Sequence, residues 1–207
     1  MKPMYLCAGM SRSGSTWLYN VVRLLTEQHY DPVHVGYVTS FQADWRANFE
    51  AAVIKVHDKT PKLVEGSVIF TCYRDLRDVA ASLMLKKWVN ASNVIGALHS
   101  AVEGYEYYRP LSTFEFEYRL LIGEPVSLIE SIAEVMGLWC EPQAIARAVQ
   151  DMEHSKYSSA TYDSTNLLHH QHFTKRVPGY YKEVLSPKLI EQIEDTFGPW
   201  LKEKGYA

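Results

Sequence analysis

Two glycines near the N-terminus are spaced as in loops that bind phosphate groups. The segment reads Gly9-Met10-Ser11-Arg12-Ser13-Gly14-Ser15-Thr16, and the phosphate-binding pattern is G-x-x-x-x-G-K-[ST]. A turn of this kind that runs into a helix presents backbone N–H groups and the positive end of the helix dipole to an anion. The segment therefore predicts an anion site that suits phosphate or sulfate. The alternative interpretation is a Gly/Ser turn that only starts a buried helix, because glycine-spaced turns are common.

Ser15 stands at the position where the phosphate-binding pattern has lysine. That lysine normally contacts the β- and γ-phosphates of a nucleoside triphosphate, so its absence favours a different nucleotide as the ligand. Arg12, inside the same loop, is the candidate for supplying the positive charge.

Two further polar residues each follow a short apolar run. Residues 51–56 are rich in β-branched side chains and stop at His57, and residues 68–73 stop at Arg74. Histidine is a candidate general base near neutral pH, and arginine can hold a phosphate by charge-assisted hydrogen bonds. Each residue also has a plainer interpretation. His57 is then a structural residue at a strand end, and Arg74 forms a surface ion pair with Asp78.

Strands and helices in alternation must position these residues. The apolar runs at residues 4–8, 51–56 and 68–73 predict strands, because each is short and ends at a glycine or a polar cluster. Helical spacing of apolar residues follows the first and the third of these runs. A fourth strand is expected at residues 113–116, and further helices at residues 90–108, 126–137, 141–152 and 187–197, the last with Ser186 as N-cap and Gly198-Pro199 as a stop.

This alternation predicts an α/β fold in a single domain over residues 1–207. We expect a central parallel sheet flanked by helices, with a P-loop-like strand-loop-helix unit at the N-terminus. In such sheets, ligands bind beyond the carboxyl ends of the strands. Because the glycine-spaced loop, His57 and Arg74 each follow a strand, all three are expected at one rim.

The composition is that of an ordinary globular chain. Of 207 residues, 47% are apolar and 22% are charged, and 21 Lys+Arg against 24 Asp+Glu give a net charge of −3. These values exclude disordered, collagen-like and disulfide-dense classes, and no basic excess suggests a nucleic-acid partner. The three cysteines lack zinc or disulfide spacing and are interpreted as reduced core residues. With no signal-peptide pattern and no apolar run of 18 residues, we expect no membrane partner and a cytoplasmic location.

Four motifs together resemble one enzyme family. Ser11-Arg12-Ser13-Gly14-Ser15-Thr16-Trp17 is similar to the 5′-phosphosulfate loop, P-K-[ST]-G-T-T-W, of sulfotransferases that use 3′-phosphoadenosine 5′-phosphosulfate (PAPS). Lys55-Val56-His57 resembles the family's strand ending in K-x-H, and residues 74–82 resemble its 3′-phosphate motif, R-[ND]-P-[KR]-D-x-x-x-S. A weaker match is Gly179-Tyr180-Tyr181-Lys182, similar to G-D-W-K, with Lys175 and Arg176 shortly before it. The motifs occur in the family's order along most of the chain.

The resemblance implies how the nucleotide binds. Trp17 would stack on the adenine, although a core aromatic on the first helix explains it equally well. Tyr181 stands where the family has tryptophan, and a clear R-K-G pattern is absent. The implied binding residues are Arg12, Ser13, Gly14, Ser15, Thr16 and Trp17 at the 5′ side, with Arg74, Ser82 and the candidates Lys175 and Arg176 at the 3′-phosphate.

The resemblance also implies catalytic roles. His57 would be the general base that takes the acceptor's proton, while Lys55 and Arg12 would stabilise the bridging oxygen and the leaving phosphate. Arg12 departs from the lysine that soluble members carry there. Arginine supplies a cation in forked geometry but cannot donate its proton to a leaving group.

We therefore expect a PAPS-dependent sulfotransferase that acts without a metal on a hydroxyl or amine of a small-molecule, glycan or peptide acceptor. One alternative is a P-loop nucleotide or small-molecule kinase, against which the missing Gly-Lys-[Ser/Thr] counts. The other is a nucleotide-binding module that has lost catalysis. The histidines His169, His170 and His172 have no carboxylate or cysteine at ligand spacing and are interpreted as a polar loop. The acceptor and the oligomeric state stay open.

Overall fold

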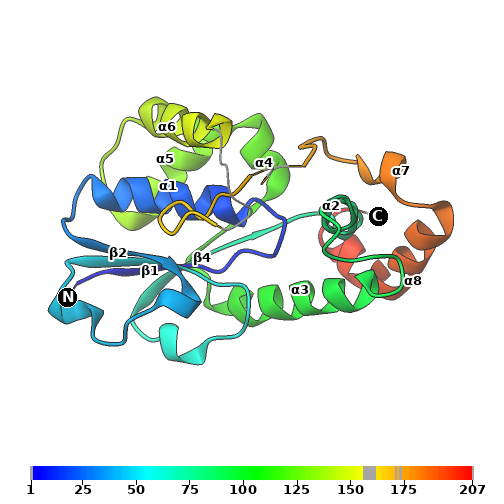
Figure 1. Ribbon diagram of the computed structural model, residues 1–207, viewed down its shortest axis with the longest axis horizontal. Coiled ribbons are helices and arrows are strands. Elements are labelled where there is room, and N and C mark those ends of the chain that lie inside the picture. Colours follow the sequence, from blue (N-terminus) through cyan, green and yellow to red (C-terminus); the bar gives the residue numbers. More distant parts are fainter. Residues whose placement is uncertain (1, 156–161, 171, 173, 207) are drawn as a thin grey trace.

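A computed structural model describes residues 2–155, 162–170, 172 and 174–206. Its centre is a sheet of five parallel strands in the order β2-β3-β1-β4-β5, flanked by helices (Figure 1). The strands are β1 (Met4–Cys7), β2 (Val33–Tyr37), β3 (Ala51–Lys55), β4 (Ser67–Tyr73) and β5 (Phe114–Glu117). The α-helices are α1 (Ser15–Glu27), α2 (Leu76–Leu85), α3 (Val94–Tyr108), α4 (Tyr118–Gly123), α5 (Pro125–Met136), α6 (Pro142–His154), α7 (Tyr181–Val184) and α8 (Pro187–Glu203).

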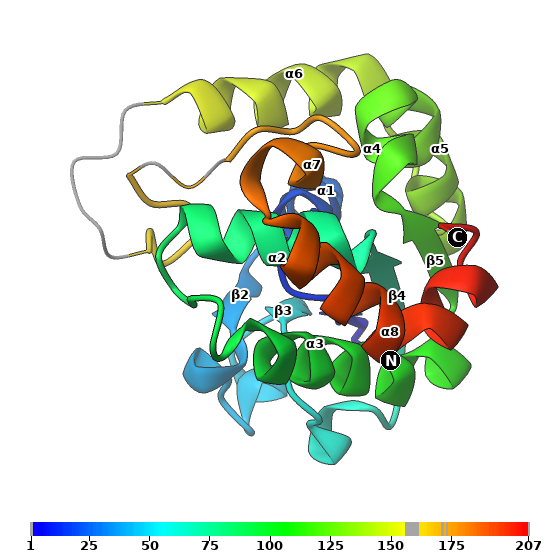
Figure 2. The ribbon, with the colours of Figure 1, turned by 90° about the vertical axis from the view of Figure 1, so that its right-hand side faces the viewer.

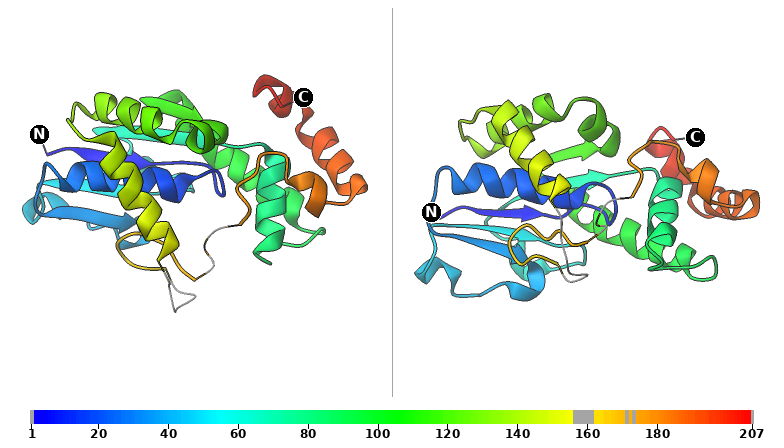
Figure 3. Two further views of the ribbon diagram at one scale, coloured as in Figure 1. Left: turned by 90° about the horizontal axis from the view of Figure 1, so that it is seen from above. Right: turned by 45° about the horizontal axis from the view of Figure 1, so that its top comes forward.

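The central strand β1 sends alternate side chains to opposite faces of the sheet, as a strand must. Tyr5 and Cys7 pack with α1, α5 and α6 in one apolar cluster. Met4 and Leu6 pack in a second cluster on the other face, with Tyr108 of α3. Figure 3 shows α6 crossing over α1 on the first face. Helices therefore cover both faces, which is the expected α/β architecture.

A third apolar cluster lies beyond the carboxyl ends of the strands. It joins α2, α3, α7 and α8, which Figure 2 shows grouped at the end of the molecule that carries the C-terminus. Asp75 caps α2 by accepting a hydrogen bond from the N–H of Arg77 at 2.9 Å. This cluster forms one wall of the space next to the strand ends.

The strands predicted at residues 4–8, 51–56, 68–73 and 113–116 are confirmed to within one or two residues. The strand β2 was not predicted; it lies at the sheet edge, and only His34 and Gly36 of its five residues are buried. The predicted stop at Gly198-Pro199 was wrong, because α8 continues to Glu203. The two residues after the proline, Trp200 and Leu201, are buried in the third cluster, and this burial outweighs the backbone hydrogen bond that proline lacks.

Other features of the described residues bear on the expected class. Cys7 and Cys72 are buried free thiols, as expected of core residues, and Cys140 is half-buried and also free. No described helix has the length and apolarity needed to cross a bilayer. Within the same residues, no three His, Cys, Asp or Glu side chains are grouped so that they could hold a metal ion.

Candidate active site

The glycine-spaced loop connects β1 to α1 and is anchored to β4. The N–H groups of Ala8 and Met10 donate to the carbonyls of Phe70 (2.8 Å) and Cys72 (2.9 Å). The loop ends at Gly14, which has φ 89° and immediately precedes α1. This left-handed conformation favours glycine, and a Cβ at the position would in addition lie 2.6 Å from Leu121 Cδ1.

Beside this loop is a cavity that is open to solvent. Arg12, Gly14, Ser15, Thr16, Trp17, Lys55, His57, Arg74 and Arg176 line it. These nine residues are among the predicted site residues, so segments far apart in the sequence meet at one place, at the carboxyl ends of β1, β3 and β4.

Ser13, Ser82 and Lys175 are predicted site residues that do not line the cavity. The buried Ser13 hydroxyl donates within the loop, to Met10 O at 2.6 Å, and thus supports the loop from inside. Ser82 contacts Arg12 instead of the open space. Lys175 is 61% exposed, with its ammonium near Glu183 (3.8 Å).

Lys55 is the last residue of β3 and points under the loop. Its Nζ donates a hydrogen bond of 2.6 Å to Thr16 Oγ1, and the side chain is buried. Burial, and next the positive charge of Arg12, lower the pKa of Lys55 to about 8. Thr16 keeps its own hydroxyl proton for donation into the cavity, because its oxygen acts as acceptor towards Lys55.

His57 follows β3 by two residues, and its ring orientation is fixed by the backbone. Nδ1 lies 2.7 Å from the carbonyl oxygen of Gly9, which can only accept, so Nδ1 carries the proton and Nε2 is free to act as a base. Burial, followed by the nearby charges of Lys55 and Arg12, lowers the pKa of His57 below its usual 6.5. The ring is therefore neutral at pH 7.

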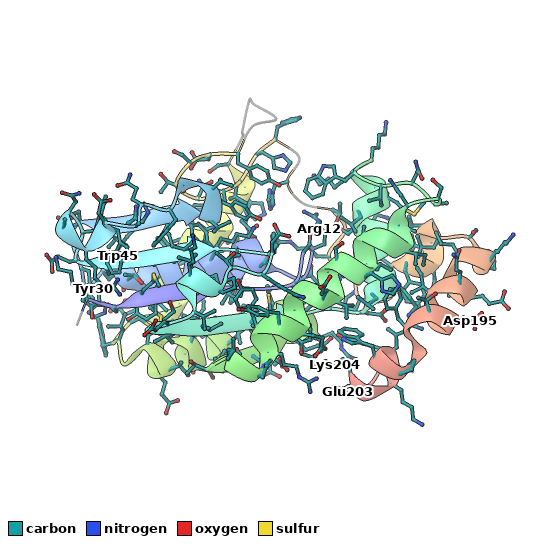
Figure 4. All side chains as sticks on the ribbon, turned by 90° about the horizontal axis from the view of Figure 1, so that it is seen from below. Arg12, Tyr30, Trp45, Asp195, Glu203 and Lys204 are labelled. Carbon is teal, nitrogen blue, oxygen red and sulfur yellow. The ribbon has the colours of Figure 1, made fainter. Side chains whose placement is uncertain are left out.

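Arg12 lies between the strand ends and the helices beyond them, as Figure 4 shows from below. Its Nε donates to Ser82 Oγ at 2.9 Å, and its Nη2 donates to the carbonyl of His172 at 3.3 Å. The guanidinium carbon is 5.3 Å from the ring centroid of Trp88. Burial lowers the pKa of Arg12 to about 10, which leaves the group fully charged at pH 7.

Arg74 is buried at the cavity wall, and its ion pair with Asp78 is internal. The Nη2 to Oδ2 distance is 3.7 Å, and the two side chains are 6% and 3% exposed, so the surface pair that we considered for Arg74 is wrong. The guanidinium lies over the Tyr118 ring at 4.1 Å, and Nη1 donates to the Arg12 carbonyl at 3.4 Å. Nε has no hydrogen-bond partner among the described residues. A buried donor of this kind is costly unless a ligand satisfies it.

Trp17 and Arg176 complete the predicted set. Trp17 packs edge-on against Phe116 at 6.1 Å, as expected of a core aromatic, and it also lines the cavity. Arg176 lines the cavity, and its Nη2 pairs with Glu153 at 2.6 Å.

Several lining residues were not predicted as site residues. They are Ser11, Trp88, Tyr118, Leu121, Tyr162, His172 and Thr174. The segment that contains His169 and His172 is a loop, as expected, but both side chains are buried and His172 faces the cavity. Ser11 lies in the glycine-spaced loop, and the histidine run was a signal for His172. Tyr118 and Tyr162 lie in stretches with no distinctive pattern.

Comparisons with known proteins show the family of this chain. The family model described as "Sulfotransferase domain" matches residues 2–205. The chain belongs to the sulfotransferase family. No curated protein sequence matches it.

Solved structures of two enzymes resemble this sulfotransferase in fold, one of them in two complexes. Mouse sulfotransferase SULT7A1 complexed with PAP superimposes with a TM-score of 0.71 at 16% identity, covering 100% of this chain and 90% of that one. Retinol dehydratase in complex with retinol and PAP gives a TM-score of 0.65 at 15% identity, covering 97% and 81%. A second retinol dehydratase complex, with androsterone and inactive cofactor PAP, gives the same values.

Proposed function

We propose that this sulfotransferase transfers the sulfuryl group of PAPS to an acceptor hydroxyl or amine, with His57 as general base. The observation that carries the proposal is the meeting of the glycine-spaced loop, Lys55, His57 and Arg74 around one cavity. Support for the nucleotide also comes from PAP in the complexes of the structural neighbours.

The charges of the cavity suit a nucleotide with a phosphosulfate at one end and a phosphate at the other. Arg12, Lys55, Arg74 and Arg176 line it, and none of the lining residues within the described chain is a carboxylate. The donor that Arg74 Nε leaves without a partner fits a phosphate oxygen. We infer that Arg74 binds the 3′-phosphate, that the loop binds the 5′ end, and that Trp17 contacts the adenine.

The same chemistry argues against the kinase alternative. P-loop kinases hold Mg²⁺ with a loop hydroxyl and an acidic residue, and they use the loop lysine on the phosphates. Here Ser15 replaces that lysine, and the Thr16 hydroxyl already accepts a hydrogen bond from Lys55. With no acidic side chain among the described lining residues, a magnesium nucleotide is poorly matched.

The proposed reaction gives the protein two tasks, which are to accept the acceptor's proton and to stabilise the leaving group. Bound PAPS supplies an activated sulfuryl group, whose bond to the bridging oxygen breaks as the acceptor atom bonds to sulfur. Nε2 of His57 takes the acceptor's proton, because Nδ1 is held by Gly9 and the ring is neutral. Lys55 and Arg12 stabilise the negative charge that develops on the leaving bisphosphate. Arg12 acts here as a fixed cation, since its proton is not transferable.

We infer a small-molecule acceptor, because retinol and androsterone occupy the neighbouring structures; glycan and peptide acceptors are the alternatives to be screened. We also propose a cytoplasmic location, supported by the three free cysteines.

A thermal-shift titration tests the nucleotide. Adenosine 3′,5′-bisphosphate (PAP) at one hundred times its Kd should stabilise the fold by about 2.7 kcal/mol, a rise in Tm of roughly 5–10 °C for a chain of this size. ATP with magnesium should give a much smaller rise. A larger shift with ATP would overturn the donor assignment in favour of a kinase.

A transfer assay then separates enzyme from binding module. His57→Ala should bind PAP like the wild type and lose sulfuryl transfer to a panel of phenols, sugars and peptides. Unchanged turnover in His57→Ala would remove His57 as the base. If PAP binds the wild type and no acceptor is sulfated, the module alternative is correct.

A further inference from the structure

Three described residues other than glycine have a left-handed backbone: Arg12 (φ 62°), Lys87 (φ 56°) and Leu167 (φ 58°). This region is unfavourable for an L-residue with a side chain, so surrounding structure must enforce it, and such residues cluster at functional sites. Two of the three belong to one contact at the cavity, between Arg12 and Trp88. Arg12 is one of its partners, and Lys87 directly precedes the other.

Lys87 lies in the turn directly after α2, and this turn places the next residue, Trp88. The N–H of Lys87 donates to Met84 O at 2.9 Å, and the N–H of Trp88 donates to Leu83 O at 3.2 Å. This is the Schellman pattern, in which the left-handed position is normally glycine. Lysine occupies it here, and the reversal of the chain brings Trp88 to the cavity wall.

The contact itself is that of a cation with an aromatic ring. The Arg12 guanidinium carbon is 5.3 Å from the Trp88 ring centroid, within the range of a cation–π interaction. The same guanidinium also donates hydrogen bonds to Ser82 Oγ and to the His172 carbonyl. Trp88 remains 47% exposed, which is unusual for a tryptophan whose role is only to fill the core.

We propose that Trp88 is a positioning residue for sulfuryl transfer: its ring fixes the orientation of the Arg12 guanidinium in the cavity. The inference rests on the proposed function of Arg12 as a cation for the leaving group. A flat guanidinium stacks on an indole ring and still directs N–H groups in its plane, whereas an ammonium has no such plane. Trp88 therefore gives a physical reason for arginine at position 12, where the resemblance leads us to expect lysine.

A first test reads the Arg12 side chain directly and needs no turnover. In ¹⁵N-labelled protein, the Nε–H signal that disappears in Arg12→Lys belongs to Arg12. In Trp88→Leu this N–H should exchange with water roughly 3- to 30-fold faster, the range that a cation–π contact supports. Trp88→Phe should restore most of the protection. Trp139→Leu is the matched control, because Trp139 is 73% exposed and does not line the cavity.

The second test is kinetic. Trp88→Leu should lower kcat roughly 3- to 30-fold, with the acceptor KM and the PAP Kd within twofold of wild type and with rescue by Trp88→Phe. In an Arg12→Ala background, the same Trp88→Leu change should lower kcat less than twofold, since its effect acts through the guanidinium.

The outcomes separate this inference from the proposed function. A raised acceptor KM with unchanged kcat would mean that Trp88 stacks on the acceptor, and would overturn the positioning role. So would exchange of the Arg12 Nε–H that is the same in Trp88→Leu and wild type. If the wild type sulfates nothing, the proposed function fails, and the exchange measurement still decides whether Trp88 orients Arg12.

Discussion

Gly104 on α3 lies against the backbone of His57, and this contact allows the position of the proposed base to be tested from a distance. A Cβ added at Gly104 would lie 2.3 Å from the carbonyl oxygen of His57. Real Cβ contacts begin at 3.0 Å, so in Gly104→Ala the His57 backbone or α3 must move by about 0.7 Å. The neighbour is backbone, which cannot rotate away as a flexible side chain can.

The expected movement of the His57 backbone would disturb the short hydrogen bond that orients the His57 ring. His57 is held by a 2.7 Å hydrogen bond from Nδ1 to Gly9 O, and a shift of about 1 Å in a catalytic group can cost on the order of 100-fold in rate. For about 0.7 Å we expect kcat to fall roughly 10- to 100-fold. Overpacking should also lower the free energy of unfolding by about 1–3 kcal/mol. The PAP Kd should change less than threefold, because the atoms that the added Cβ meets belong to His57, whereas Arg74 follows β4.

The assay is sulfuryl transfer from PAPS at saturating acceptor, alongside PAP titration calorimetry and a thermal melt. Gly96→Ala is the control, since it lies on the same helix and no atom is within 4 Å of its Cβ position. That change should leave kcat unaltered and stabilise the fold by about 0.5–1 kcal/mol. If Gly104→Ala lost stability as expected but kept wild-type kcat, the placement of His57 would not control the reaction.

Three further predictions concern charges in and behind the cavity. Because the pKa of Lys55 is lowered to about 8, its positive charge is lost as pH rises through that value. PAP affinity measured by calorimetry should therefore weaken between pH 7 and 9, and Lys55→Arg should flatten this decline. Equal declines in wild type and variant would exclude Lys55 as the cause. The pKa of His57 is lowered below 6.5, so the base stays neutral in mild acid and kcat/KM should stay constant from pH 7.5 to 6. A fall of kcat/KM with a midpoint near pH 6.5 would instead show an exposed, unperturbed histidine. Asp78→Asn would leave Arg74 buried without its counter-charge and would disturb the hydrogen bonds that Asp78 accepts from the N–H groups of Gly179 and Tyr181. The change should cost about 3–5 kcal/mol and lower the Tm by roughly 6–20 °C. PAP should recover part of this loss, and an unchanged Tm would contradict a stabilising role of the buried carboxylate.

Four of the five strands were predictable from the sequence, including β5 at one edge of the sheet. β1, β3 and β4 are short apolar runs that end at glycine or at a charged residue, and their order along the chain implied a common rim. β2 has no such run, because His34 and Gly36 interrupt it and the strand lies at the half-exposed sheet edge. The end of α8 was misjudged for another reason. Local rules stop a helix at Gly198-Pro199, and long-range burial of Trp200 overrides them.

The residues of the candidate site also divide into those that could be predicted from the sequence and those that could not. Arg12, His57 and Arg74 were identifiable, because each lies directly after a strand or in the loop that follows one. Lys55 was identified through the resemblance to the family's strand ending in K-x-H. The walls of the cavity were not, since they come from elements with no distinctive sequence. Tyr118 begins α4 just after β5, and Trp88 reaches the cavity only through the left-handed turn after α2. Side chains placed by such turns and by long-range packing have no periodic signal in the sequence.

The central claim is that one nucleotide spans the loop and Arg74, and calorimetry with two ligands tests it most directly. The wild type should bind adenosine 3′,5′-bisphosphate roughly 10- to 100-fold more tightly than adenosine 5′-monophosphate, as expected for a charge-assisted contact to the 3′-phosphate. Arg74→Gln should bind both nucleotides with nearly equal affinity. Equal affinities in the wild type, or a preference for the bisphosphate that survives in Arg74→Gln, would contradict the claim.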